Sequence, residues 1–440
     1  MKIEDFVFDA SSGIYISSAK IKQIDYLDGS ERYLYEVLMS THDLGLLSNE
    51  LRSKIKDWPS LYHLSPYRAT ILDCFDFQNK DAKVLELGAG CGAVTRWLGE
   101  HFQDVHAIEG SFQRAYINGL RCRGISGVKV YTANFFDVDI EKQFDILTLI
   151  GVLEYSHIYH PIHKKDPYEA AFSALQFAHR ALKEHGILLL AIENKLGLKY
   201  FSGAKEDHTG KLFDGIQGYP DANSPVTFSA AELDQLLRSA GFTAIDFYLP
   251  FPDYKLARTV LNAQALSTHH HYLYNWIETP FPDRCTKQRM LLFNESLALR
   301  EISKAGLLRE FSNSFLIIAH KGGEKDNLQR LCISPHTWIA KHYTLDRYAA
   351  YCIKTTLLQA SSGILEIDKA VAFGKYYDTP PPNPAYKHSV AQEKYHKGDL
   401  LLFSVFEMLL TENFDSHPDM LDCIVLWIEE TAADYCNLLI

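Results

Sequence analysis

The sequence lacks any apolar run that approaches the ~20 residues a helix needs to cross a bilayer. It has no stretch typical of a secretory signal peptide either. Its eight cysteines include no C-x-x-C pair, which excludes the commonest zinc-ligand spacing and indicates reduced thiols rather than a disulfide framework. We therefore expect a cytoplasmic protein with no membrane span.

Basic residues are also in short supply. Lys and Arg number 44 against 55 Asp and Glu, which gives a formal net charge of −11. The basic residues are scattered, and their longest run is Lys164-Lys165. Proteins that grip a nucleic-acid backbone normally present a basic face. The composition therefore argues against a nucleic-acid partner.

The most informative segment is residues 84–92, Val-Leu-Glu-Leu-Gly-Ala-Gly-Cys-Gly. Glycines behind an apolar strand let the backbone turn tightly and approach a ligand. Residues 93–98 have helical spacing, so the loop ends at a helix N-terminus, whose free N–H groups favour an anionic or polar group. A dinucleotide fingerprint reads G-x-G-x-x-G, whereas here the third glycine comes one residue early and Glu86 precedes the loop. The segment therefore predicts a nucleotide site of another kind.

Further strands follow this loop in order, at residues 105–109, 128–132 and 144–150. The first ends in Glu109, and a carboxylate at a strand end can accept hydrogen bonds from vicinal ribose hydroxyls. In this order, the pattern E-x-G-x-G-x-G resembles motif I of class I S-adenosylmethionine (SAM) dependent methyltransferases. The resemblance implies SAM as the cofactor.

The same resemblance assigns roles along the chain. It implies that Asn134 and Phe135 recognise adenine and that residues 151–155 form motif IV beside the methyl group. Residues expected at the cofactor are Glu86, Gly88, Ala89, Gly90, Gly92, Glu109, Gly110, Asn134, Phe135, Ile150, Gly151 and Tyr155.

The expected fold is α/β, with a Rossmann-like doubly wound sheet of seven strands. A fifth strand at 186–193 is almost wholly apolar, which fits burial on both faces, and a helix is expected before it at 170–183. Ser229 and Glu232 predict a capping box for a helix that runs to residue 240. Strands six and seven, at 243–249 and 315–320, form an antiparallel pair with a short turn in the family. The long interval here predicts an insertion at 250–312.

The chain is longer than one core usually spans. We expect the methyltransferase domain at residues 61–321. Residues 1–60 are expected to form an N-terminal helical lid, with helices at 26–39 and 44–58. Residues 322–440 are expected to form a C-terminal α+β accessory domain of unknown role, with a strand at 338–343, a proline-rich break at 379–384 and helices at 400–411 and 420–440. This last part has no H-R-D or D-F-G motif, so we expect no kinase activity.

A narrower resemblance concerns the acceptor. Residues 150–155, 192–200 and 206–210 resemble phrases of methyltransferases encoded in bacterial surface-polysaccharide clusters, alone or fused to glycosyltransferases. The resemblance implies a sugar or glycan hydroxyl as the acceptor and a glycosyltransferase as a partner, and it leaves a homodimer open.

Methyl transfer to a hydroxyl requires alignment with the donor's C–S bond and a general base. His208 is the expected base, oriented by Asp207 or Glu206, although a structural role in its loop remains open. Glu193 and Glu154 complete the expected catalytic set. Residues expected to bind the substrate are Asn194, Lys199, Tyr200, Asp207, Asp214, Tyr219 and Tyr254.

No residue is assigned to a metal. Residues 269–271 are consecutive histidines, which point in different directions and have no carboxylate at matching spacing. Nothing in the spacing of Asp207 and Asp214 demands an ion. Two other functions stay open: a SAM-dependent methyltransferase of a small natural product or amine, and a non-catalytic SAM-binding scaffold for a glycosyltransferase.

Overall fold

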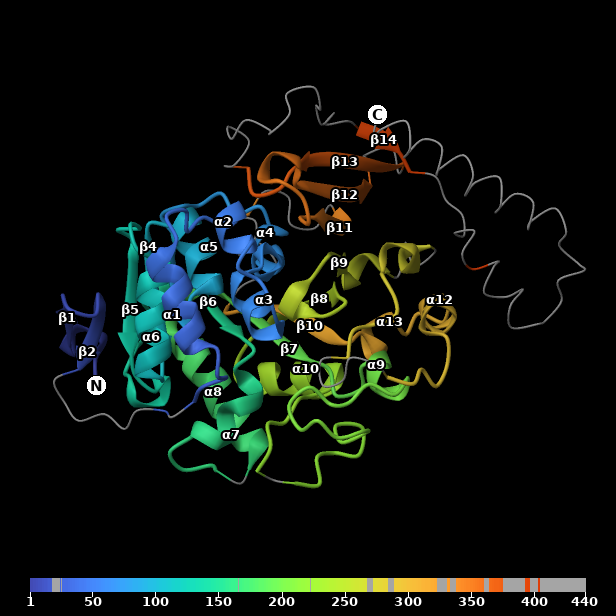
Figure 1. Ribbon diagram of the computed structural model, residues 1–440. Coiled ribbons are helices and arrows are strands. Elements are labelled where there is room, and N and C mark those ends of the chain that lie inside the picture. The colour runs from blue at the N-terminus through green and yellow to red at the C-terminus, as the bar shows by residue number, and fades with distance from the viewer. Residues whose placement is uncertain are drawn as a thin grey trace, which may run out of the picture.

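The structure is a computed structural model of the chain (Figure 1). It describes residues 1–17, 24, 26–164, 166–221, 223–266, 272–283, 289–322, 331–332, 338–359, 364–374, 392–395 and 403. The histidines at 269–271, the break at 379–384 and, apart from Phe403, the two helices expected near the C-terminus lie outside the described residues.

The described residues form one mixed sheet of 14 strands, in the order β1-β2-β5-β4-β3-β6-β7-β10-β8-β9-β11-β12-β13-β14. Its centre holds the strands that the sequence predicts. They are β3 (Lys83–Leu87), β4 (Asp104–Glu109), β5 (Val128–Thr132), β6 (Phe144–Ile150), β7 (Leu182–Glu193), β8 (Ala244–Phe251) and β10 (Ser314–His320). The first five pair in parallel, and β10 runs antiparallel between β7 and β8. The Rossmann-like α/β fold is thus confirmed, within a larger sheet than the seven strands predicted.

Separate hydrophobic cores lie on the two faces of this sheet. Along β7, Leu188 and Leu190 belong to one core while Ile187 and Leu189 belong to the other, as alternation in a strand requires. Helices α8 (Pro167–Ala181) and α10 (Ala230–Ser239) contribute to the first core, and α5 (Ala93–His101) to the second. Burial on both faces explains why β7 is almost entirely apolar.

Helix α10 begins as predicted. The Ser229 hydroxyl accepts a hydrogen bond from the Glu232 N–H, and the Glu232 carboxylate accepts one from the Ser229 N–H at 2.7 Å. Two N–H groups that the helix leaves unpaired are thereby satisfied.

The N-terminal region differs from the two long helices expected there. It contains a hairpin, β1 (Phe6–Asp9) and β2 (Ile14–Ser17), then α1 (Glu31–Ser40), α2 (Asn49–Arg52) and α3 (Trp58–Leu64). The hairpin joins the sheet through a parallel bridge between Tyr15 and Tyr131 of β5, at the edge opposite β14 (Figure 1). The helix expected at 44–58 is wrong: Ser48 caps the short α2, and Asp57 caps a new helix, α3, in which Pro59 occupies the first turn, where its fixed φ is favourable.

The sheet continues beyond β8. Strand β9 (Thr259–Asn262) pairs with β8 and also with β11 (Trp338–Thr344), which is followed by β12 (Ile353–Gln359), β13 (Leu365–Val371) and β14 (Gln392–Lys394). Figure 1 shows these late strands stacked along one end of the molecule. The described strands of the expected accessory region therefore extend the central sheet rather than forming a second one.

Ion pairs fasten these late strands to the helices before β3. Lys354 of β12 lies 3.3 Å from the carboxylate of Asp73 and also contacts Asp76, and Lys341 of β11 contacts Asp76. Asp73 belongs to α4 (Thr70–Asp73) and also accepts a hydrogen bond from the Tyr343 hydroxyl at 2.9 Å.

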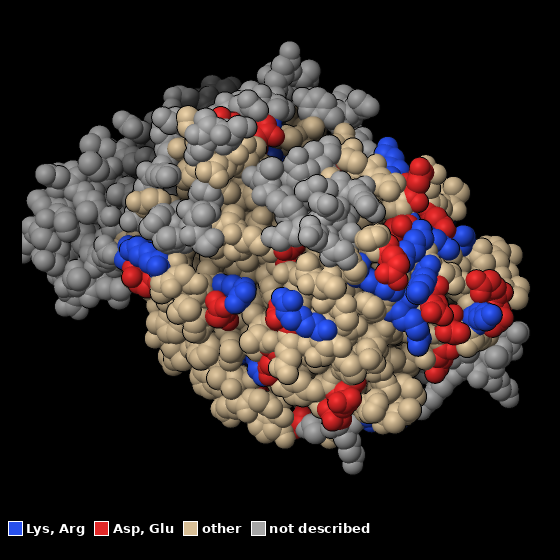
Figure 2. Space-filling model, turned by 180° about the vertical axis from the view of Figure 1, so that it is seen from behind, with Lys and Arg blue, Asp and Glu red and all other residues tan. Residues whose placement is uncertain are grey.

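Two observations concern the surface. None of the described helices combines the length and apolar composition needed to span a membrane. On the face drawn in Figure 2, basic and acidic side chains lie beside one another, so the described residues of that face form no broad area of one charge.

Candidate active site

The site lies where the strand order reverses. The chain runs from β3 outward through β4 and β5, then crosses to the other side of β3 to form β6 and β7. Loops at the carboxyl ends of strands diverge at such a point and leave a crevice for ligands. A cavity of about 370 Å³ opens there, within the size range of small-ligand pockets.

The glycine loop forms one wall of the cavity. Gly88, Gly90 and Gly92 have φ values of +66°, +54° and +87°. Residues that carry a side chain rarely adopt such positive φ values. A Cβ on Gly88 would lie 2.4 Å from Cγ2 of Val152, another cavity residue. The loop therefore presents bare backbone to the cavity, as a closely held ligand requires.

Nearly all residues predicted for the cofactor line this one cavity. They are Glu86, Gly88, Ala89, Gly90, Glu109, Gly110, Asn134, Phe135, Ile150, Gly151 and Tyr155. Gly92 does not line it but is the N-cap of α5, where a Cβ would lie 2.7 Å from the Asn118 side-chain oxygen.

Two carboxylates hold the base of the cavity. Glu109 accepts hydrogen bonds from the N–H groups of Gly90 (2.7 Å) and Ser111 (2.9 Å), which ties the end of β4 to the glycine loop. Glu86 lies deeper, and its carboxyl accepts a hydrogen bond from the Thr95 hydroxyl at 2.6 Å. Burial raises the pKa of Glu86 to about 8, so this group is mostly neutral at pH 7.

Asn134 stabilises the turn that positions it. Its side-chain oxygen accepts a hydrogen bond from the Phe136 N–H, and its amide donates to the Tyr159 carbonyl at 2.9 Å. Phe135 follows as a buried ring in the cavity wall. The pair forms a polar and an apolar edge side by side.

The N-terminal region supplies cavity residues that the sequence did not indicate. Asp28 lies 2.8 Å from the ring of His63 and 3.1 Å from Arg114, and these three line the cavity with Tyr26. Burial opposes ionisation of Asp28, but His63 and Arg114 outweigh it and hold the pKa of Asp28 well below its usual range. No sequence signal joins these residues, because they come from three separate segments.

Arg68 is a further cavity residue that was not predicted from sequence. It is 4% exposed, and its Nε atom is buried with no hydrogen-bond partner among the described residues. One of its terminal nitrogens donates to the Lys255 carbonyl at 3.0 Å. A buried guanidinium with an unused donor suits the carboxylate of an amino-acid ligand. With the bare glycine loop and Glu109, it gives the cavity the groups that SAM requires.

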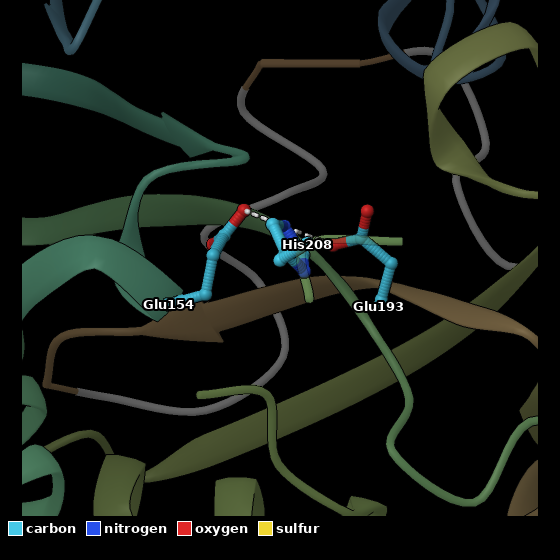
Figure 3. Close-up of side chains that lie close together, drawn as sticks. All are labelled: Glu154, Glu193 and His208. Carbon is cyan, nitrogen blue, oxygen red and sulfur yellow. Dashed lines mark ion pairs between the residues drawn. The ribbon is translucent and has the colours of Figure 1, made fainter. Parts of the chain in front are cut away.

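The three residues predicted as catalytic come together beside this cavity. Nε2 of His208 lies 3.8 Å from Oε1 of Glu154 and 4.0 Å from Oε2 of Glu193. Figure 3 shows the imidazole between the two carboxylates. Glu154 comes from a 3-10 helix (Leu153–Tyr155) that follows β6, and Glu193 ends β7. Glu154 and His208 line the cavity, whereas Glu193 stands behind them.

A further carboxylate orients His208. Glu206 Oε1 lies 3.0 Å from Nδ1 of the ring, and the other Glu206 oxygen accepts from the N–H groups of His208 and Thr209. Burial alone would lower the pKa of His208, but the carboxylates of Glu154 and Glu206 raise it to about 10. The ring is therefore protonated at neutral pH in the unliganded protein, and it must lose a proton before it can act as a base.

Two lysines form ion pairs with carboxylates near the triad of Glu154, Glu193 and His208. Lys255 contacts Glu193 and lies 2.8 Å from Asp207, and Lys199 lies 2.8 Å from the same Asp207 oxygen. Asp207 and Tyr254 line the cavity, as expected for substrate residues. Lys255 also lines it, although it was not among the residues predicted for the site.

The other residues predicted to bind substrate do not line the cavity: Asn194, Lys199, Tyr200, Asp214 and Tyr219. Three of them, Asn194, Lys199 and Tyr219, hold the surrounding loops instead. The Asn194 amide donates to the carbonyls of Glu310 and Ser312 at 2.8 Å each, and the Tyr219 hydroxyl donates to Glu206 at 3.2 Å. The sequence alone does not distinguish polar loop residues that contact a ligand from those that hydrogen-bond to nearby backbone groups.

One family model matches the part of the chain that holds the glycine loop and the parallel strands β3 to β7. Residues 62–246 match the family model described as a methyltransferase domain. No curated protein matches the chain in sequence.

Solved structures give distant matches. A phosphoethanolamine N-methyltransferase 2 from Haemonchus contortus, bound to phosphomonomethylethanolamine and S-adenosylhomocysteine, is 15% identical with a TM-score of 0.37. The match covers 66% of this chain and 57% of that one. A possible histamine N-methyltransferase from Thermotoga maritima is 17% identical with a TM-score of 0.34, covering 60% of this chain and 92% of that one. The chain thus spans little more than half of the Haemonchus protein.

Proposed function

We propose, from the premise that residues 62–246 form a class I SAM-dependent methyltransferase domain, that the chain methylates a hydroxyl of a sugar or glycan intermediate in surface-polysaccharide biosynthesis. SAM supplies an electrophilic methyl group on a sulfonium centre. The glycine loop, Glu109 and Arg68 bind this donor, with Asn134 and Phe135 at its adenine.

The observation that carries the proposal is the buried set of proton-exchanging groups at the cavity. Glu154 and His208 line the same cavity as the glycine loop, with Glu193 4.0 Å from the histidine ring. A sugar hydroxyl is a weak nucleophile near neutral pH, so its proton must pass to a group held next to it. Glu154 Oε2 is buried without a hydrogen-bond partner among the described residues, and it suits that role.

The surrounding residues support a polar acceptor. Asp207, Lys255 and Tyr254 line the cavity near the triad and offer a carboxylate, an ammonium and a buried phenol. Such mixed donors and acceptors suit the hydroxyls of a carbohydrate, and the aromatic ring suits its apolar face. The acceptor's place in a surface-polysaccharide pathway, a glycosyltransferase partner and a homodimer rest on the sequence resemblance.

An amine is the second candidate acceptor. Two buried carboxylates, Glu154 and Glu193, would stabilise an ammonium group before transfer. An amine acceptor must reach the donor unprotonated, so the same carboxylates would also take its proton. The non-catalytic scaffold is less well supported, because binding of SAM alone does not require the buried cluster of Glu154, Glu193 and His208.

Methyl transfer from labelled SAM to nucleotide sugars, polysaccharide and amines tests the proposal directly. We expect label in a sugar-containing fraction. His208→Gln should lower kcat by about 10²-fold or more, the usual contribution of a proton-transfer group, and leave SAM affinity within about twofold. Label found only in amines would contradict the hydroxyl acceptor, and SAM binding without transfer to any class would favour the scaffold.

A further inference from the structure

The space between Glu154, Glu193 and His208 has the dimensions of a metal site. The facing atoms of these three residues all lie within 4.8 Å of one another, and the histidine nitrogen is 3.8 and 4.0 Å from the two carboxylate oxygens. These separations exceed hydrogen-bonding distance. They approach the separation of two ligands that each lie about 2.0–2.2 Å from a shared ion.

The side chains of the triad are nearly inaccessible and incompletely paired. Glu154 is 1% exposed and Glu193 0%. Oε2 of each has no hydrogen-bond partner among the described residues. The unpaired Oε2 of Glu193 is the oxygen that faces Nε2 of His208, whereas Glu154 faces it through Oε1. An unpaired carboxylate oxygen away from water is costly, so a cation beside it would be stabilised. Lys255 contacts Oε1 of Glu193, so Oε2 remains directed toward the histidine.

The second contact of His208 is the one that metal-binding histidines usually make. Glu206 holds the Nδ1 side of the ring at 3.0 Å, which leaves Nε2 directed at the two carboxylates. A carboxylate on the far nitrogen fixes the ring orientation and strengthens the near nitrogen as a ligand. Glu206 is itself fixed by backbone N–H groups at 2.7 Å.

We propose that Glu154, Glu193 and His208 bind one divalent metal ion, and that its open positions face the cavity and hold the acceptor hydroxyl. The metal-activating role rests on the proposed function. Two oxygens and one imidazole nitrogen suit ions such as Mn²⁺ or Zn²⁺, and binding of the ion would displace the proton from Nε2 of His208. A hydroxyl on such an ion would have a lowered pKa and would lose its proton more readily to a neighbouring carboxylate. Its oxygen would then form the bond to the methyl carbon as the C–S bond of SAM breaks, and S-adenosylhomocysteine would leave.

Binding of Mn²⁺ to the full chain tests the site without requiring turnover. Free Mn²⁺ has an electron paramagnetic resonance signal that is lost on binding, so a titration without SAM or acceptor counts bound ions. We expect one Mn²⁺ per chain, displaced by Zn²⁺, which binds such ligands more tightly. Glu154→Gln and Glu193→Gln should each weaken binding by about tenfold or more.

Asp246→Asn is the matched control. Asp246 forms a buried carboxylate–histidine pair with His320 at 3.2 Å, outside the triad, so this variant should bind Mn²⁺ like the unchanged protein. Circular dichroism establishes that each variant is folded, and either glutamine variant alone suffices if the other is not. His208→Gln provides a third test of the same ligand set.

A chain that leaves both Mn²⁺ and Zn²⁺ free at millimolar concentration would overturn the site, as would binding that the folded Glu154→Gln and Glu193→Gln variants retain in full. Hydroxyl methylation that continues at full rate after chelation would overturn the activating role while the proposed function stood. Stoichiometric Mn²⁺ binding together with transfer only to amines would support the site and contradict the proposed function.

Discussion

Gly88 is the residue at which the glycine loop tolerates least change. It has a positive φ, and a Cβ would meet Val152 across the cavity at 2.4 Å. Gly88→Ala should therefore weaken binding of S-adenosylhomocysteine by about tenfold or more, close to 1.4 kcal/mol, as measured by calorimetry. The substitution combines backbone strain of about 1–2 kcal/mol with displacement of a residue that shapes the site.

Gly124→Ala separates these two effects. Gly124 has a φ of +86° but nothing within 4 Å of its Cβ position, and it does not line the cavity. This variant should lose some stability and keep its affinity. Unchanged affinity in Gly88→Ala would show that the loop does not contact the ligand.

The buried Glu86 predicts a distinctive dependence of stability on pH. Its pKa is about 8 in the folded chain against 4.5 for the free side chain, so the folded state retains a proton that the unfolded state releases between these values. The contribution of Glu86 to the free energy of unfolding therefore falls as pH rises from 4.5 to about 8. The melting temperature of Glu86→Gln should increase relative to the unchanged protein across that range, measured by calorimetry from acid to alkaline pH.

Glu232→Gln is a control of opposite sign. The neighbouring Lys195 and Tyr168 outweigh the burial of Glu232 and lower its pKa to about 2. Its contribution is present above the usual carboxyl range and is lost toward acid pH. Parallel melting profiles for the two variants would contradict the assigned environments.

At the scale of elements, Asp73 of α4 and Asp76 just after it attach the helix to β11 and β12. Asp73→Ala removes the partner of the Tyr343 hydroxyl and one partner of Lys354. Because Asp73 is buried and Lys354 retains Asp76, we expect a loss of about 1–3 kcal/mol in the free energy of unfolding by urea. Asp234→Ala, which breaks an exposed pair with Arg238, should change it by less than about 1 kcal/mol. Equal effects of the two variants would contradict this account.

Short strands between turns were predictable from sequence. The bounds of β5 and β6 agree with prediction, because both segments are rich in β-branched, aromatic and other apolar residues. The hairpin β1–β2 was missed because its strands have four residues each and carry exposed aromatic and polar side chains. Its turn depends on Asp9, which accepts hydrogen bonds from the N–H groups of Ser11 and Ser12. Such a turn alone does not identify a hairpin when the strands beside it are this short.

At the scale of the whole molecule, the sequence predicts the central strands but not the extent of the sheet. The order of motifs along the chain identifies β3 to β7, whereas the pairing of β9 with β11 joins Leu261 to Ala340. Such long-range pairings depend on tertiary packing and leave no local pattern. The same limit applies to the site: its glycine loop was readable, but the contact between Lys255 and Glu193 was not.

The crevice between β3 and β6 should hold a SAM-type donor, because the roles assigned to the residues around it all depend on that ligand. A crystal structure of the full chain with S-adenosylhomocysteine tests it most directly. We predict the amino-acid portion against the backbone of residues 88–92, with its carboxylate at Arg68, and the ribose hydroxyls at Glu109. A crevice without the ligand at saturating concentration, or a ligand bound elsewhere, would contradict the account.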